Sequence, residues 1–305
     1  MRLAHCSDLH LLSHDGAGWL KLANKRWIGA ANLMTNRSRH YHVAAFEHMV
    51  DDLNALGVEH VLCTGDVTNL ALEQEFVFAR KLFDRLKVGP DNVTVLPGNH
   101  DAYVAEGIGL FARIFDDYHR SDPGWEPTDT TYDPRWPLVR VRGDLALIGL
   151  TTSRATAWFT AYGMVGQPQL ERLRKILLDD RLRGKARVVA IHHPPAGKWA
   201  ANRIRGLHDH LAFAQVIAEC GCDLIVHGHE HRDLSETLAG PNGPVPVRGI
   251  VSGTYEHDKP MRTARYRIFE IDRGRITTDH TRVWRRGDSR FEAEAGTAQQ
   301  SNYAT

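Results

Sequence analysis

The chain has 305 residues, of which 42% are hydrophobic and 25% charged, as expected for a globular protein with a buried core. Its 38 Lys and Arg nearly balance its 37 Asp and Glu, so the charge does not support a protein covered in nucleic acid. The unusual counts are 18 histidines and only four cysteines. No C-x-x-C spacing occurs among the cysteines, so a thiolate zinc site is not indicated.

The remaining global features indicate a cytoplasmic protein. Few cysteines, expected as buried reduced thiols, agree with a reducing compartment. The N-terminus enters a strand without a basic-then-apolar leader, and no apolar run approaches the ~18 residues of a membrane span. Contact with a membrane surface stays compatible with the sequence.

In chain order, short β-branched runs alternate with amphipathic stretches. This alternation predicts parallel strands joined by helices. Strands are expected at 2–6, 60–63, 92–96, 138–141, 145–150, 187–191 and 223–226, and helices at 43–57, 72–87, 168–183 and 211–219. Residues 117–137 are predicted to form a surface loop, and the period-two pattern over 245–283 predicts antiparallel strands. The last stretch, 285–305, has few large apolar residues and is predicted to be a mobile tail.

Polar clusters stand where five of the predicted strands end. The carboxyl ends of parallel strands share one edge of a sheet, which is where open α/β sheets bind ligands. Each cluster alone has an ordinary explanation as a turn or a strand cap. Together they supply Asp, Asn and His, the ligand types of divalent transition metals. The clusters contain Asp8 and His10; Asp66; Asn99, His100 and Asp101; His192 and His193; and His227, His229 and His231.

In order and approximate spacing, these motifs resemble those of the calcineurin-like metallophosphoesterases. The matching residues are Asp8-x-His10, Gly65-Asp66, Gly98-Asn99-His100-Asp101, His192 before x-Pro, and Gly228-His229-x-His231. The match runs from the first strand to about residue 232. The resemblance implies an α/β fold with four layers, α/β/β/α, in which two mixed β-sheets are flanked by helices. It makes residues 1–284 one catalytic domain.

The same resemblance implies a centre of two divalent metal ions. One ion would be held by Asp8, His10 and His231, the other by Asn99, His192 and His229, and Asp66 would bridge them. His193 competes with His192 as the ligand, but the family usually places its ligand two residues before a proline, which favours His192. Mn²⁺ is the metal expected to support activity, and Fe, Zn, Co or Ni would also suit these ligands.

The implied reaction is hydrolysis of a phosphodiester or pyrophosphate bond by a hydroxide that bridges the metals. His100 would stabilise the developing charge or protonate the leaving oxygen. Asp101 would orient the His100 imidazole, with a plain helix N-cap as the alternative.

Two basic stretches are candidates for substrate selection. The insert 14–42 mixes basic and apolar residues and predicts a lid or a helix packed on the core; 198–205, with Trp199, predicts a phosphate contact or a solvated loop. The substrate is expected to be a small phosphoester, nucleotide- or lipid-linked. The compact size and the His-His-Pro-Pro segment 192–195 resemble relatives that cleave cyclic nucleotides or glycerophosphodiesters. The basic and apolar insert instead resembles relatives that cleave UDP-2,3-diacylglucosamine in lipid A synthesis. A phosphomonoesterase and a non-catalytic metal-binding scaffold remain alternatives. A DNA-repair nuclease is disfavoured because capping and coiled-coil segments are missing, and nothing indicates an oligomeric state.

Overall fold

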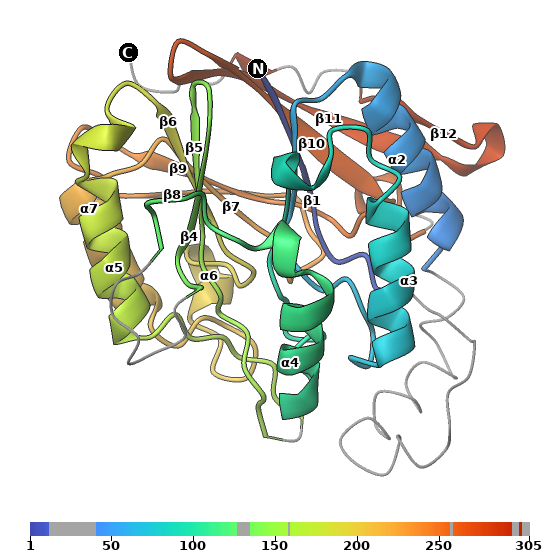
Figure 1. The fold of residues 1–305 in the computed structure, drawn as a ribbon, viewed down its shortest axis with the longest axis horizontal. Coiled ribbons are helices and arrows are strands. Elements are labelled where there is room, and N and C mark those ends of the chain that lie inside the picture. Colours follow the sequence, from blue (N-terminus) through green and yellow to red (C-terminus); the bar gives the residue numbers. More distant parts are fainter. Residues whose placement is uncertain (12–40, 127–134, 158, 257–258, 295–298, 301–305) are drawn as a thin grey trace.

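The fold consists of two mixed β-sheets packed face to face between two layers of helices (Figure 1). The computed structural model describes residues 1–11, 41–126, 135–157, 159–256, 259–294 and 299–300. In Figure 1, helices α5 (Gln167–Leu177) and α7 (His210–Cys220) lie on one side of the sheets. Helices α2 (Val43–Leu56), α3 (Glu73–Phe83) and α4 (Ala105–Ile114) lie on the other. The predicted α/β class with two mixed sheets is confirmed.

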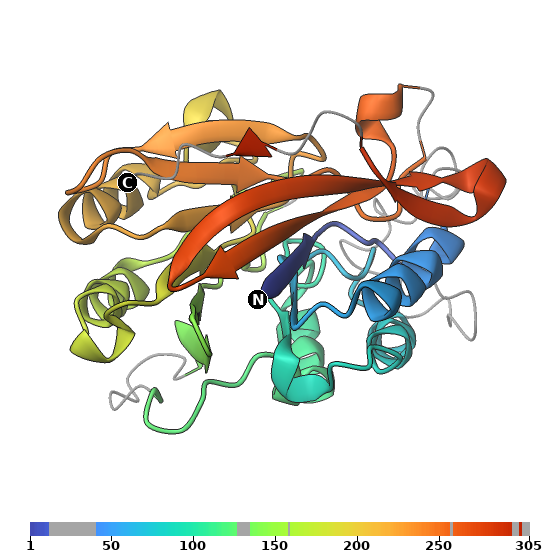
Figure 2. The same ribbon diagram turned by 90° about the horizontal axis from the view of Figure 1, so that it is seen from above.

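The first sheet has the strand order β12-β11-β10-β1-β2-β3, with β13 also paired to β11. The pairs β1–β2 and β2–β3 are parallel, whereas β10, β11 and β12 run antiparallel to their neighbours. The strand bounds are β1 Arg2–Cys6, β2 His60–Cys63, β3 Val93–Val95, β10 Arg265–Asp272, β11 Arg275–Arg285, β12 Arg290–Ala293 and β13 Gln299–Gln300. Figure 2 shows the long β10–β11 hairpin running alongside β1.

The second sheet has the strand order β4-β5-β6-β7-β9-β8, in which β5, β6, β7 and β9 are parallel and the two edge strands antiparallel. Its strand bounds are β4 Leu138–Arg142, β5 Leu145–Gly149, β6 Ala186–Ala190, β7 Leu224–His227, β8 Leu234–Leu238 and β9 Val245–Gly249. The short helices are α6 (Gly197–Ala200) and 3₁₀ turns at Pro90–Asn92, Asp116–Tyr118, Asp180–Leu182, Pro260–Arg262 and Arg286–Asp288.

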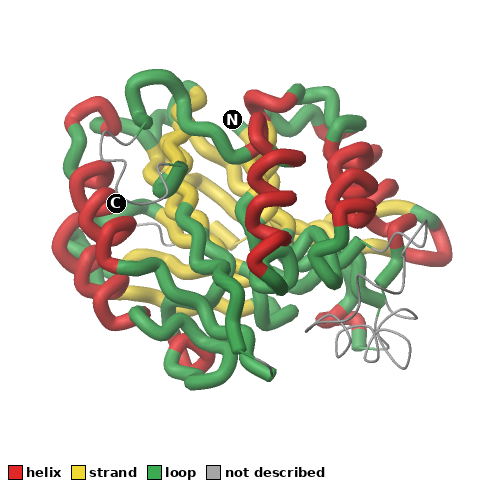
Figure 3. The backbone as a smooth tube through the Cα atoms, turned by 60° about the horizontal axis from the view of Figure 1, so that its bottom comes forward, coloured by secondary structure: helices red, strands yellow, loops and turns green. Residues whose placement is uncertain are grey.

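Apolar side chains fill the space between the two sheets. Leu3 of β1, Leu62 of β2 and Val188 of β6 belong to one cluster that joins the facing sheet surfaces. Because the central strands are covered on both faces, they read as continuous apolar runs instead of alternating ones. This packing holds the carboxyl ends of β1, β2, β3, β6 and β7 at a common edge, which Figure 3 turns toward the reader.

Several predicted helix boundaries differ from those observed. The helix expected over 72–87 is α3, which ends at Phe83, and the one expected over 168–183 is α5, which ends at Leu177. After α5, the Asp179 carboxylate accepts a hydrogen bond from Arg181 N and starts a separate 3₁₀ turn. Helix α4 and edge strand β8 were not predicted; α4 contains two glycines, which are rare inside helices, and β8 is half exposed.

The predicted mobile tail is wrong for its first part. Residues 290–293 form β12, which pairs with β11 and contacts α2 (Figure 2). Its large apolar residue, Phe291, is buried: the side chain is 3% exposed and its ring lies 5.2 Å from the Tyr266 ring. The folded unit therefore extends beyond residue 284. Of the insert predicted at 14–42, only residues 41 and 42 are among those that the structure describes. Residues 127–134 of the predicted loop also lie outside the described residues.

Among the described residues, none of the helices combines the length and the hydropathy needed to cross a bilayer.

We predict that Phe291→Ala lowers the free energy of unfolding by about 3 kcal/mol, because it leaves a cavity against Tyr266 and α2. Urea denaturation followed by circular dichroism measures the change. Phe159→Ala is the control, since that ring is 77% exposed and its removal should cost less than about 0.5 kcal/mol. Equal stability of the two variants would mean that β12 adds nothing to the fold.

Candidate metal centre

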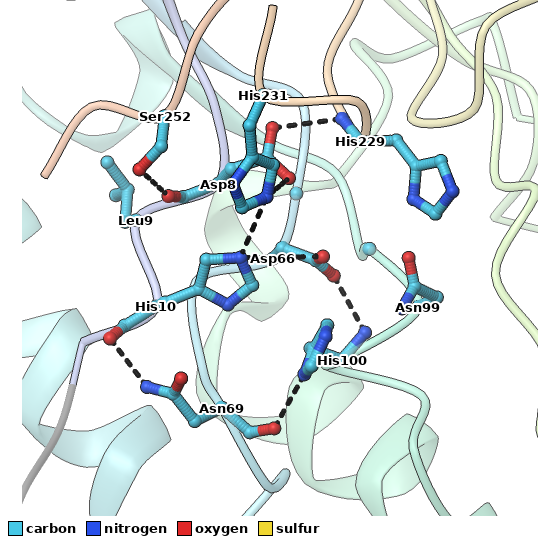
Figure 4. A network of polar contacts seen from close by, with 12 residues as sticks. Asp8, Leu9, His10, Asp66, Asn69, Asn99, His100, His229, His231 and Ser252 are labelled. Atoms are coloured by element: carbon cyan, nitrogen blue, oxygen red, sulfur yellow. Dashed lines mark hydrogen bonds and ion pairs between the residues drawn. The ribbon is translucent and has the colours of Figure 1, made fainter. Parts of the chain in front are cut away.

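Five strand ends bring polar side chains together at one edge of the two sheets (Figure 4). The first sheet contributes residues after β1, β2 and β3, and the second contributes residues after β6 and β7. The backbone is unusual here, because five non-glycine residues have left-handed φ angles of 44° to 73°. Such conformations are strained and cluster at functional sites. They are Asp8, His10, Asp66, His229 and His231.

One group of candidate ligands consists of Asp8, His10 and His231, whose ligand atoms lie within 4.8 Å of one another. The Nε2 atom of His231 lies 3.2 Å from Asp8 Oδ1 and 3.2 Å from Nε2 of His10. Two imidazole nitrogens and a carboxylate oxygen therefore face a common point.

A second group consists of Asp66, His192 and His229, again within 4.8 Å. His192 Nε2 lies 3.5 Å from Asp66 Oδ2 and 3.1 Å from Asn99 Oδ1. The same Asp66 oxygen lies 3.9 Å from His10 Nε2 of the first group. Asp66 thus stands between the two groups and is within reach of both.

Backbone carbonyls orient three of the imidazoles. The Nδ1 atoms of His10, His192 and His100 lie 3.3 Å, 2.8 Å and 2.7 Å from the carbonyl oxygens of Thr68, Thr64 and Asn69, respectively. A carbonyl oxygen can only accept, so each Nδ1 carries the proton. In the neutral ring this leaves the Nε2 lone pair available for a metal, an arrangement common among metal-binding histidines.

The charges around Asp66 favour a cation. Burial raises the pKa of Asp66, but the positive charges of His192 and His100 outweigh it and hold that pKa well below its usual value. Burial lowers the pKa of His192, yet the Asp66 carboxylate raises it to about 9. His192 then has acceptors at both nitrogens, so a proton at Nε2 stands where a metal ion would bind.

His229 fits a metal ligand for a different reason. Its Nε2 is buried and makes no hydrogen bond with the described residues; the nearest carboxylate oxygen, Glu230 Oε1, is 3.7 Å away. Burial first, then the charges of His193 and His192, hold the pKa of His229 well below its usual value. A buried ring nitrogen without a hydrogen-bond partner is costly, and a metal ion bound at that atom would satisfy it.

The alternative ligand His193 is engaged elsewhere. Its Nε2 donates to the carbonyl of Ala161 at 2.9 Å, and its Nδ1 therefore accepts from the Thr152 hydroxyl at 2.7 Å. Burial lowers the pKa of His193 to about 3, so the ring is neutral. With both nitrogens used, this geometry favours His192 as the ligand.

The orienting contact predicted between Asp101 and His100 is wrong. The Asp101 carboxylate accepts four hydrogen bonds: from Gly98 N and Thr68 N, both at 2.9 Å, from the Thr68 hydroxyl at 2.8 Å, and from Val67 N at 3.2 Å. These donors turn it away from the imidazole, which Asn69 orients instead. Helix α4 starts at Ala105, so Asp101 is not its N-cap either. Asp101 fixes the loops after β2 and β3 against each other.

Several residues that position the candidate ligands were not predicted from the sequence. Asn69 orients His100 through its carbonyl and donates to the His10 carbonyl at 2.5 Å (Figure 4). Ser252 donates to the Asp8 carbonyl at 2.6 Å, and the Tyr41 hydroxyl lies 3.3 Å from His231 Nδ1. Main-chain contacts carry no residue-type signal in the sequence, and Ser252 comes from beyond β9, far from any motif.

The comparisons with known proteins identify the family. The model of the calcineurin-like phosphoesterase family matches residues 1–233, and the chain belongs to that family. This supports a phosphoric ester hydrolase, and together with the His and Asp clusters it indicates a centre for two metal ions. No curated protein matches the sequence.

Solved structures share the fold at low sequence identity. A dimetal phosphatase from Danio rerio is 13% identical with a TM-score of 0.59, over 92% of this chain and 94% of that one. Sulfate thiohydrolase SoxB from Thermus thermophilus is 16% identical with a TM-score of 0.50, over 96% of this chain and 58% of that one. Purple acid phosphatase from Lupinus luteus seeds is 11% identical with a TM-score of 0.50, over 96% and 52%.

We predict that His192→Ala loses one of two bound metal ions, whereas His193→Ala keeps both. The reason is that only His192 turns Nε2 toward Asp66 and Asn99. Metal content after gel filtration, measured by plasma mass spectrometry, distinguishes the variants. The reverse result would exchange the roles of the two histidines.

Metal binding at pH 7 should release a proton. With a pKa of about 9, His192 is protonated in the metal-free protein, whereas Asp66 is already ionised and contributes none. The apparent affinity should then rise up to ~10-fold per pH unit and level off above pH 9. Titration calorimetry with Mn²⁺ in two buffers of different ionisation enthalpy counts the protons. Identical heats in both buffers would contradict the charge assigned to His192.

Proposed function

We propose that this protein hydrolyses phosphodiester or pyrophosphate bonds of small substrates at a centre of two divalent metal ions. One observation carries the proposal: imidazole nitrogens and carboxylates from two different sheets point at one another around Asp66 (Figure 4). Family membership supports the reaction class.

We propose the following ligands. Asp8, His10 and His231 hold one ion, Asn99, His192 and His229 hold the other, and Asp66 lies between them. When bound, the two ions supply Lewis-acid stabilisation of phosphate charge and lower the pKa of water. The absence of Cys among these ligands suits Mn²⁺, which we propose as the activating metal, although Fe, Co, Ni and Zn also suit His and carboxylate ligands.

His100 is the group proposed to meet the substrate. It is partly exposed, its Nδ1 is held by Asn69, and its ring stacks on Tyr103 at 5.8 Å. Its backbone N donates to Asp66 Oδ1 at 2.7 Å, which ties its position to the metal centre. From there, His100 stabilises charge on the phosphoryl oxygens or holds the proton that the leaving oxygen takes.

A matched panel tests the proposed reaction. The Mn²⁺-loaded protein is assayed on cyclic AMP, a glycerophosphodiester, UDP-2,3-diacylglucosamine and 4-nitrophenyl phosphate. Faster turnover of any of the first three supports the proposal, and a preference for UDP-2,3-diacylglucosamine would mark the enzyme as one of lipid A synthesis. Preference for the monoester would make the protein a phosphomonoesterase. Two bound metals without hydrolysis of any ester would make it a binding scaffold.

We predict that His100→Ala retains both metals but lowers kcat by ~10²–10⁴, the usual contribution of acid–base assistance. If His100 supplies a proton, the loss should be larger for a diester with an alkoxide leaving group than for a 4-nitrophenyl ester. Metal analysis accompanies the kinetics, because His100 also lies within 4.8 Å of His10 and Asp66. Loss of a metal ion would make His100 a ligand instead.

A further inference from the structure

The loop that contains Ala161 and Gly163 contacts His193, whose ring packs against two of the proposed metal ligands. The His193 ring lies 4.3 Å from the ring of His229 and 5.0 Å from that of His192. Its Nε2 donates to the Ala161 carbonyl at 2.9 Å. At Gly163, two residues on, a Cβ atom would come within 2.4 Å of the His193 ring, so only glycine permits this approach.

The segment containing Ala161 and Gly163 in turn holds residues 204–208. Ala161 N donates to the Ile204 carbonyl at 2.9 Å, and Gly163 N donates to the Gly206 carbonyl at 3.0 Å. Two successive hydrogen bonds therefore connect the His193 imidazole, through Ala161, to Ile204, which precedes Arg205.

The turn that carries Arg205 is itself rigidly built. The Asn202 side-chain oxygen accepts from Ile204 N at 2.9 Å and from Arg205 N at 3.0 Å. Gly206 N donates to the Asn202 carbonyl at 2.7 Å, and a Cβ at Gly206 would lie 2.3 Å from the Ala200 carbonyl oxygen. The position of Arg205 is thus set by hydrogen bonds and close packing on both sides.

The Arg205 guanidinium has no hydrogen bond or ion pair with the part of the chain that the structure describes, and it is exposed. Its neighbours Ile204 and Gly206 are hydrogen-bonded to the segment that contacts His193, so the turn that carries this guanidinium lies beside the centre.

Helix α6, which leads into this turn, carries further positive charge. Lys198 and Arg232 lie over the Trp199 ring at 5.2 Å and 5.3 Å from its centroid. Positive charge on α6 and on the turn that follows it suits a substrate with more negative charge than one diester group provides.

We propose that Arg205 is a specificity-determining residue that binds a second anionic group of the substrate, such as the adjoining phosphate of a pyrophosphate ester. The proposal rests on the proposed function and narrows its substrate class. Arginine suits the task because its planar guanidinium forms paired hydrogen bonds with phosphate oxygens.

The test compares two substrates with the same nucleoside and the same leaving group. They are the 4-nitrophenyl esters of a nucleoside 5′-monophosphate and of the corresponding 5′-diphosphate. Arg205→Ala should lower kcat/KM for the diphosphate ester about 10- to 100-fold and leave the monophosphate ester within about 3-fold. The control is Arg203→Ala, an exposed arginine on the same turn, which should change neither.

Equal losses on both esters, or no loss on either, would overturn the proposal. Calorimetric binding of inorganic pyrophosphate and of orthophosphate to the Mn²⁺-loaded protein gives a second readout. Arg205→Ala should weaken only the pyrophosphate, and unchanged pyrophosphate binding would overturn the proposal. If the wild-type protein cleaves neither these esters nor any substrate of the panel above, the proposed reaction fails, and this binding comparison alone decides the role of Arg205.

Discussion

The buried carboxylate of Asp66 is the group on which the rest of the site depends. It lies 3.5 Å from one imidazole and 3.9 Å from another, and its second oxygen accepts the backbone N–H of His100 at 2.7 Å. An ionised carboxylate buried this deeply must be compensated. In the metal-free protein the positive charge of protonated His192 compensates part of the Asp66 charge. Divalent ions would compensate the Asp66 charge more fully, because they carry two positive charges and bind the carboxylate directly.

The site spans both sheets, so it is complete only when the sheets are packed. Asp8, Asp66 and Asn99 follow strands of the first sheet, whereas His192 and His229 follow strands of the second. The apolar cluster between the sheets therefore sets the spacing of the ligands. Metal binding should in turn stabilise the packed state, since the unfolded chain has no such arrangement. The left-handed backbone at Asp8, His10, Asp66, His229 and His231 lies at this same edge, where the surrounding structure must hold the strain.

Much of this could be read from the sequence, because strand ends and ligand types leave a pattern there. Asp8, Asp66 and His229 each follow an apolar run, and parallel strands bring such ends together. Hydrogen bonds made by the main chain could not be predicted, because they do not depend on the residue type. The carbonyl of Asn69 took the role predicted for Asp101, whose carboxylate four donors turn away. Strand β12 was missed because a single buried ring, Phe291, makes too weak a periodic signal.

Anomalous X-ray diffraction from crystals grown with Mn²⁺ is the sharpest test of the two-metal centre. Two anomalous peaks are expected roughly 3.5–4 Å apart, one on each side of the Asp66 carboxylate. The peaks should contact His10 and His231 on one side, and His192 and His229 on the other. A single peak, or peaks away from Asp66, would contradict the two-metal centre.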